Sequence, residues 1–165
     1  MLDAVYTRGF ELLRTALTSE LAENAPVHAS TRRILALAQA YRRFGLANPA
    51  LYALMFERPL PDFDPPPSLR SGALEMTFTL LIDEVRAAAD SGVVTAPDPT
   101  RTAYLLWTAI HGMVSIELTH ALRSPLPGWF LDRPQVGEQI LIQGVASLLA
   151  GLGVQAAGIQ SWPPS

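Results

Sequence analysis

Proline positions limit every regular element that this chain can form. A proline inside a helix removes a hydrogen bond and clashes with the preceding turn. The 14 prolines leave long proline-free stretches in which apolar residues recur at helical spacing, and we find no strand-like alternation. The pattern predicts helices over about 2–23, 30–47, 49–56, 68–90, 99–122 and 134–149. The chain is therefore expected to be all-α, with about six helices in one domain.

Capping residues support these limits. Asn48-Pro49 and Asp98-Pro99 each place a capping side chain before a proline at the first helical position. Ser91-Gly92 predicts a helix stop, because glycine readily takes the left-handed conformation that ends helices. Residues 59–67 contain five prolines and predict a surface loop. We expect the domain to cover residues 1–152 and a flexible tail to follow over residues 153–165.

The composition excludes several classes of function. Hydrophobic residues make up 49% of the chain and charged residues 16%, which excludes disorder and allows a large core. The net charge of −3 gives no electrostatic footprint for nucleic acid or anionic membrane. All 12 basic residues are arginine, so lysine chemistry is excluded, and the absence of cysteine excludes thiol chemistry. No export or membrane segment is apparent, so a cytoplasmic protein is expected.

The polar residues give no sign of catalysis or metal binding. His28 is expected in a loop, and His111 and His120 are spaced so that they point to opposite sides of one helix. Asp83 and Glu84 are adjacent and diverge in the same way. No serine lies in a G-x-S-x-G turn. We therefore expect no catalytic residue, no metal site and no cofactor.

Large apolar side chains are dense in the middle of the chain. Such residues at helical spacing usually form core, but several helices around so many of them can also enclose a ligand cavity. Trp107 and His111 are four residues apart, so they share one face of an apolar helix. If a cavity exists, His111 would be its natural polar group. The candidate ligand-binding residues are Phe44, Phe56, Phe78, Trp107 and His111.

Glycines recur at intervals of seven near the end of the chain, at Gly137, Gly144 and Gly151. Glycine costs about 1 kcal/mol relative to alanine inside a helix, so its repeated use indicates a close helix crossing, unless it only reflects composition. Together with the apolar run 105–116, this stripe predicts that the last two large helices pack against a second copy. The candidate interface residues are Gly137, Ile140, Leu141, Gly144 and Leu148.

Two segments resemble the regulatory domain of TetR-type transcriptional regulators. In the first, Phe44, Asn48-Pro49 and Leu51–Phe56 match the pattern F-x-x-x-N-P-x-L-Y-x-L-M-F. In the second, Trp107, His111-Gly112 and Glu117 match Trp-x-x-x-His-Gly-x-x-x-x-Glu, which is typical of one subclass. The segments have the expected separation, and the resemblance extends from Leu2 to about Leu152.

The resemblance implies a homodimer in which the last two large helices of each copy form a four-helix bundle. It also implies a small-molecule pocket between the middle helices of each protomer, and a first helix that links this pocket to a DNA-binding unit. The family's N-terminal helix-turn-helix has no counterpart in this sequence, so we expect a truncated form or a late translational start. The function implied is that of a repressor, whose binding to a palindromic operator is controlled by a small apolar effector.

Two other interpretations stay open from the residues alone. The first is a stand-alone dimeric all-α adaptor that binds no DNA. The second is a helical enzyme with His111 as general base and Glu117 or His120 as its partner. The absence of a third polar partner on the His111 face of its helix disfavours the enzyme.

Overall fold

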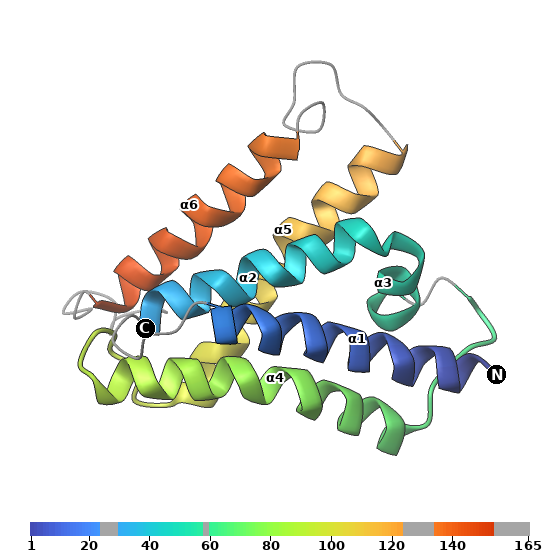
Figure 1. Ribbon diagram of the computed structural model, residues 1–165, viewed down its shortest axis with the longest axis horizontal. Helices are drawn as coiled ribbons and strands as arrows, with labels where there is room; N and C mark the ends of the chain where they lie inside the picture. The colour runs from blue at the N-terminus through green and yellow to red at the C-terminus, as the bar shows by residue number, and fades with distance from the viewer. Residues whose placement is uncertain (24–29, 58–59, 124–133, 154–165) are drawn as a thin grey trace, which may run out of the picture.

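The computed structural model describes residues 1–23, 30–57, 60–123 and 134–153, and within these ranges the only regular elements are helices. Each helix starts within one residue of its expected position, which confirms the all-α prediction (Figure 1). The expected tail, residues 153–165, lies outside the described residues apart from Gly153. The helices are α1 (Leu2–Glu23), α2 (Ser30–Ala47), α3 (Pro49–Phe56), α4 (Pro67–Asp90), α5 (Pro99–Arg123) and α6 (Pro134–Gly153).

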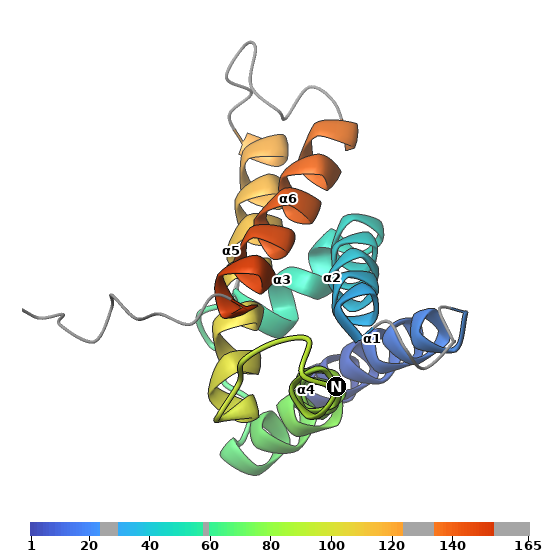
Figure 2. The same ribbon diagram turned by 90° about the vertical axis from the view of Figure 1, so that its left-hand side faces the viewer.

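Helix α2 is the centre of this arrangement, because it packs against each of the other five described helices. Figures 1 and 2 show α1 and α4 side by side along one edge of the molecule, with α2 beside them. In both views α5 and α6 rise together away from that edge. The molecule therefore has two parts that share α2: a layer that contains α1 and α4, and the pair α5 and α6.

Every described helix sends at least one large side chain fully into the core. These side chains are at most 1% exposed, and they come from positions that repeat at helical spacing along each element. Burial of apolar surface at about 25 cal/mol per Å² is the main source of stability for such a fold. One such residue from each helix, in chain order, is Phe10, Ile34, Tyr52, Val85, Leu106 and Leu141.

Two of the expected helix ends are confirmed in detail. The backbone N–H of Arg101 donates a hydrogen bond to Oδ1 of Asp98 at 3.0 Å, which caps the start of α5. Gly92 follows the end of α4 with a φ of 74°, a left-handed conformation that other residues adopt at a cost. The aspartate and the glycine are therefore required by the local backbone.

Asn48 departs from its expected role. It lies at the N-cap position of α3 ahead of Pro49, but its side chain makes no capping hydrogen bond to α3. Instead, its Nδ2 donates to the carbonyl oxygen of Phe44 at 3.0 Å. The side chain therefore adds a second hydrogen bond to a carbonyl oxygen that also accepts the backbone N–H of Asn48 at 3.0 Å, and it closes the corner between the two helices.

Helix α6 is longer than expected and continues to Gly153. Two contacts of Leu152 explain the extra turn. Its side chain packs against the core, and its carbonyl oxygen accepts a hydrogen bond from the backbone N–H of Thr95 at 2.9 Å. Packing of this kind overrides the weak helix propensity of the glycines at the end of the chain.

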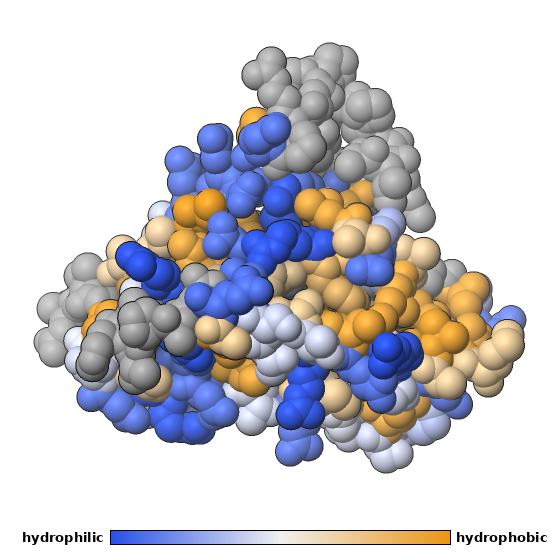
Figure 3. Space-filling model, in the orientation of Figure 1, coloured by the Kyte–Doolittle hydropathy of each residue, from blue (hydrophilic) through white to orange (hydrophobic). Residues whose placement is uncertain are grey.

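The surface is divided between apolar and hydrophilic regions. Figure 3 shows apolar residues toward the side where α3 and the start of α1 lie, and hydrophilic residues over the opposite half of α4. Leu2 and Val5, at the start of α1, are 36% and 42% exposed. Among the helices described, none combines the length and the apolar character that a membrane crossing requires.

Candidate functional site

An apolar cavity of about 180 Å³ lies where α1, α2, α3, α4 and α5 meet. Its walls come from five helices because each presents an apolar stripe of residues three or four positions apart. Examples are Leu13 and Leu17 on α1, and Phe78 and Leu81 on α4. The lining residues are Leu13, Leu17, Leu37, Ala38, Tyr41, Phe56, Leu74, Thr77, Phe78, Leu81, Tyr104, Trp107 and Ile110.

Three aromatic rings form one wall of this cavity, at the contact between α4 and α5. The ring centroids of Phe78 and Trp107 are 6.3 Å apart, and those of Tyr104 and Trp107 are 5.8 Å apart. Two of the lining residues are also open to solvent, since Tyr104 is 57% exposed and Leu74 is 37% exposed. The cavity therefore opens to the surface between α4 and α5.

A hydrogen-bonded cluster of Tyr41, Tyr52 and His111 lies beside the cavity. The hydroxyl oxygens of Tyr41 and Tyr52 are 2.9 and 2.8 Å from Nδ1 of His111, and 3.2 Å from each other. Tyr41 also lines the cavity, and the ring of His111 stacks on that of Trp107 with centroids 5.4 Å apart. The cluster thus supports two cavity walls from behind, one on α2 and one on α5.

Burial keeps this cluster uncharged. It lowers the pKa of His111 and raises the pKa of both Tyr41 and Tyr52. A neutral histidine with a lone pair on Nδ1 can accept one tyrosine hydroxyl, while the second hydroxyl donates to the first. Both hydroxyl protons are then used inside the cluster, which supports the cavity wall.

The sequence-derived ligand residues fall into two groups. Phe56, Phe78 and Trp107 line the cavity. Phe44 is 6% exposed and lies in the core, outside the lining, while His111 contacts the lining residues Tyr41 and Trp107 from behind. The sequence does not indicate the roles of Tyr41 and Tyr52, because their hydroxyls meet His111 only through the packing of α2 and α3 against α5.

Helix α5 carries a second polar contact, a buried ion pair with α2. Nε and a terminal nitrogen of Arg42 donate to the two carboxylate oxygens of Glu117 at 2.8 and 2.7 Å. Arg42 is 6% exposed and Glu117 is 8% exposed. Glu117 therefore directs its carboxylate to Arg42, which speaks against the interpretation that pairs it with His111 as an acid and base. The side chain of His120, the other suggested partner, lies outside the described residues.

The candidate interface residues lie around the crossing of α5 and α6 within one chain. A Cβ atom added to Gly137 would collide with the carboxylate of Glu117, and one added to Gly144 would lie 2.8 Å from Sδ of Met113. Leu141 is 1% exposed and belongs to the core, whereas Ile140 and Leu148 are half-buried. Two of the three stripe glycines therefore permit a close approach inside the protomer, while Gly151 has open space around it.

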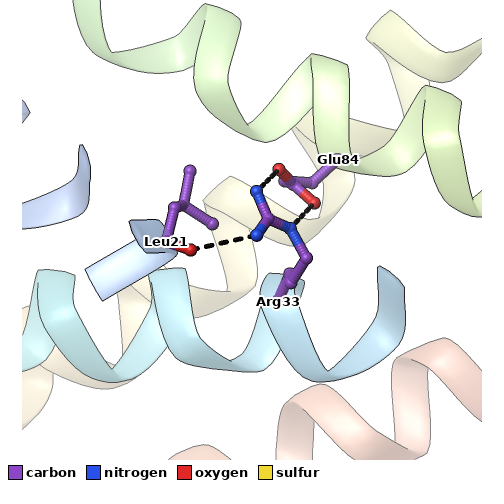
Figure 4. A network of polar contacts seen from close by, with 3 residues as sticks. All are labelled: Leu21, Arg33 and Glu84. Carbon is purple, nitrogen blue, oxygen red and sulfur yellow. Dashed lines mark hydrogen bonds and ion pairs between the residues drawn. The ribbon is translucent and has the colours of Figure 1, made fainter. Parts of the chain in front are cut away.

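A third network joins α1, α2 and α4 (Figure 4). Arg33 on α2 donates from two nitrogens to the carboxylate of Glu84 on α4, at 2.8 and 2.7 Å. Its remaining terminal nitrogen donates to the carbonyl oxygen of Leu21 at 3.0 Å, close to the end of α1. This carbonyl belongs to the last turn of a helix, where no intrahelical partner exists. The network thus fixes one end of α1.

The described residues contain no group of three histidine, aspartate or glutamate side chains placed to hold a metal ion. The features with a clear physical character are therefore the apolar cavity and the polar contacts that hold its walls. An arrangement of this kind can enclose an apolar molecule, and the two ion pairs Arg33–Glu84 and Arg42–Glu117 hold the helices around it.

Comparison with known proteins identifies the family. Residues 34–133 match the family described as "Tetracyclin repressor-like, C-terminal domain". HTH-type transcriptional regulator Rv1816 of Mycobacterium tuberculosis and its counterpart Mb1846 of Mycobacterium bovis are each 24% identical over 110 residues, which cover 52% of this chain and 47% of the relative. The chain thus spans about half the length of the curated relatives it matches.

A solved structure supports the fold. The structure of a protein with unknown function from Rhodococcus sp. RHA1 matches with a TM-score of 0.72 and 24% sequence identity, over 93% of this chain and 72% of that one. The fold, the family match over more than half of the chain and the regulators among its relatives agree with the resemblance read from the sequence. The chain belongs to the tetracyclin repressor-like C-terminal domain family of transcription regulators.

Proposed function

We propose that this chain is the effector-sensing and dimerisation region of a transcriptional regulator. A small apolar molecule in the cavity controls DNA binding by a helix-turn-helix unit elsewhere in the regulator. The whole regulator acts as a cytoplasmic repressor. The proposal is supported by the family and by relatives that are HTH-type regulators about twice as long as the matched region. The observation that carries it is the cavity, whose walls include α1, α4 and α5.

Helix α1 is the element that would report the state of the cavity. Leu13 and Leu17 form part of the cavity wall, so an occupant touches α1 directly. An effector that binds more tightly to one position of α1 than to another shifts the population toward that position. Because of this difference in affinity, effector binding changes the free energy of operator binding, and operator binding changes that of effector binding by the same amount.

The cavity is tested by filling it. Ala38 lines the cavity and is 1% exposed, so an Ala38→Met side chain would extend into space that is open in the parent. Methionine adapts to irregular gaps, and filling a cavity is compatible with the fold. We expect the affinity for toluene, used as an apolar probe, to fall by about tenfold or more, with little change in melting temperature. Titration calorimetry measures the toluene affinity, and thermal unfolding measures the melting temperature. If the parent and the Ala38→Met variant bind toluene equally well, toluene does not bind in this cavity.

The dimer is proposed to form through the outer faces of α5 and α6. Leu105 and Ile116 on α5 are 49% and 51% exposed, which is unusual for large apolar side chains on the same helix. Gly112 lies between them, and a Cβ added there meets no atom within 4 Å. Ile140 and Leu148 on α6 would add to this face, while Gly137, Leu141 and Gly144 support it from beneath through the α5–α6 crossing.

A pair of matched glycine variants tests the dimer. Both Gly112 and Gly72 are helical glycines at which an added Cβ meets no atom within 4 Å, so a side chain can begin at either position without a clash inside the protomer. If a second copy packs over α5, Gly112→Leu should weaken dimerisation by about tenfold or more, whereas Gly72→Leu on α4 should not. Sedimentation velocity over a concentration series measures the dissociation constant. A parent that stays monomeric, or a Gly112→Leu variant that dimerises like the parent, contradicts the proposed interface.

A further inference from the structure

The chemistry of the cavity lining restricts what can bind there. None of its residues is charged, and its hydroxyl groups are those of Tyr41, Thr77 and Tyr104. The Tyr41 hydroxyl is held in the cluster with Tyr52 and His111, and Oγ1 of Thr77 lies 3.3 Å from the carbonyl oxygen of Leu74, to which it donates. The most exposed of the three is Tyr104, at the opening of the cavity.

Charged groups elsewhere do not change this character. Three ion pairs join α2 to its neighbours, and the arginine of each lies outside the lining and faces a carboxylate: Arg33–Glu84, Arg42–Glu117 and Arg43–Glu20. Glu57, which acts electrostatically on the cluster of Tyr41, Tyr52 and His111, also lies outside the lining. A charged ligand in the cavity would lose its hydration without gaining a countercharge from the walls. Burial of a charge without a partner costs several kcal/mol, which is enough to prevent binding.

The size of the cavity sets a second limit. An apolar protein cavity of about 150 Å³ binds benzene. The cavity described here has a volume of about 180 Å³, which leaves room for one ring and a small substituent. Five aromatic lining residues surround this space, and their rings favour the edge and face contacts that another ring can make. They are Tyr41, Phe56, Phe78, Tyr104 and Trp107.

From these observations we propose that the effector is an uncharged, largely hydrocarbon molecule about the size of one substituted ring. It enters between α4 and α5, past Tyr104 and Leu74, which are the lining residues with the greatest exposure. This inference rests on the proposed function, because it specifies the ligand of the same cavity.

The test compares probes that differ in charge and size. Toluene is the neutral one-ring probe, benzoate and benzylammonium are charged molecules of similar shape, and progesterone is a neutral four-ring molecule. Binding is followed through the fluorescence of Trp107 in a Trp129→Phe, Trp162→Phe variant of the full chain, in which Trp107 is the remaining tryptophan. We expect toluene to bind at least about 100-fold more tightly than each of the three other probes.

A gain-of-function variant tests the reason for this selectivity. Leu74→Arg places a positive charge at the opening of the cavity, and Leu46→Arg is the matched control, because Leu46 has the same 37% exposure and lies outside the lining. Benzoate affinity should rise by about tenfold or more with Leu74→Arg and stay at the parent's value with Leu46→Arg. If the two variants change benzoate affinity equally, the lack of a countercharge in the lining is not the reason that benzoate is excluded.

The outcomes separate this inference from the proposed function. The inference is overturned if benzoate, benzylammonium or progesterone binds as tightly as toluene. If the Ala38→Met variant then loses binding of that probe, the cavity remains the proposed effector site. If none of the four probes binds, the inference is wrong. A wider set of charged and large molecules is then tested. If none of them binds with an affinity that Ala38→Met lowers, the proposed function is wrong as well.

Discussion

Removal of the Glu117 carboxylate is expected to destabilise the chain by about 3–5 kcal/mol, the cost typical of breaking a buried ion pair from one side. In Glu117→Ala, the guanidinium of Arg42 loses the two hydrogen bonds that it donates to this carboxylate, at a site where Arg42 is 6% exposed. Urea unfolding followed by circular dichroism measures the free energy of unfolding. A loss below about 1 kcal/mol, typical of surface pairs, would contradict the buried character of the pair.

A double variant provides the control. Replacement of both partners by apolar residues of similar length, Arg42→Met with Glu117→Met, should recover most of the lost stability, because neither charge is then buried. The result should depend little on salt, since buried pairs are screened much less than exposed ones. A double variant as unstable as Glu117→Ala would show that lost packing, and not the remaining charge, causes the effect.

Gly137→Ala is expected to destabilise the chain by about 1–3 kcal/mol, although alanine is the better helix former. The added Cβ would come within 2.5 Å of Cδ of Glu117. That carboxylate cannot move aside freely, because Arg42 holds both of its oxygens. Either α6 moves away from α5 or the ion pair is distorted, and both cost free energy. Thermal and urea unfolding measure the change.

Gly151→Ala is the matched control, at the same face of the same helix and two heptads further along. A Cβ added at Gly151 meets nothing within 4 Å. This substitution should leave stability unchanged or raise it by up to about 1 kcal/mol, as expected from helix propensity alone. If the two alanine variants change stability by the same amount, the close crossing of α5 and α6 at Gly137 is not the cause of the stability change.

The helices could be predicted from the sequence because local chemistry sets their limits. Asp98 caps α5, Gly92 ends α4 in a left-handed conformation, and Pro49 starts α3. Each of these signals involves residues within a few positions of one another. The end of α6 could not be predicted in this way, because Leu152 is held by Thr95, far away in sequence.

The polar contacts of the site could not be predicted for the same reason. Arg33 and Glu84 are 51 residues apart, and Arg42 and Glu117 are 75 apart. Their pairing depends on how the helices cross. Trp107 and His111, four apart on one helix, could be assigned to one face, and their rings do stack. The tyrosines that complete the cluster lie on α2 and α3, and the sequence alone does not orient those helices against α5.

The glycine pattern indicates a close helix crossing, and the structure shows one such crossing within the chain. The spacing of Gly137 and Gly144 indicates a close helix crossing, and each glycine does accommodate a neighbouring side chain. Those neighbours, Glu117 and Met113, belong to α5 of the same chain. Periodicity identifies the face of a helix that is approached closely, but it carries no information about which molecule provides the approaching helix.

Under the proposed function, the hydrogen bond from Arg33 to the Leu21 carbonyl oxygen makes α1 a lever. With Arg33 bound to the Leu21 carbonyl, the fulcrum lies near one end of the helix, and the cavity residue Leu13 lies between this fulcrum and Leu2. At 1.5 Å per residue, Leu13 is about 12 Å from the fulcrum and Leu2 is about 28 Å from it. If an occupant of the cavity tilts α1 as a rigid rod about this anchor, displacement grows about 2.4-fold, so that ~1 Å of movement at Leu13 becomes more than 2 Å at the start of the helix.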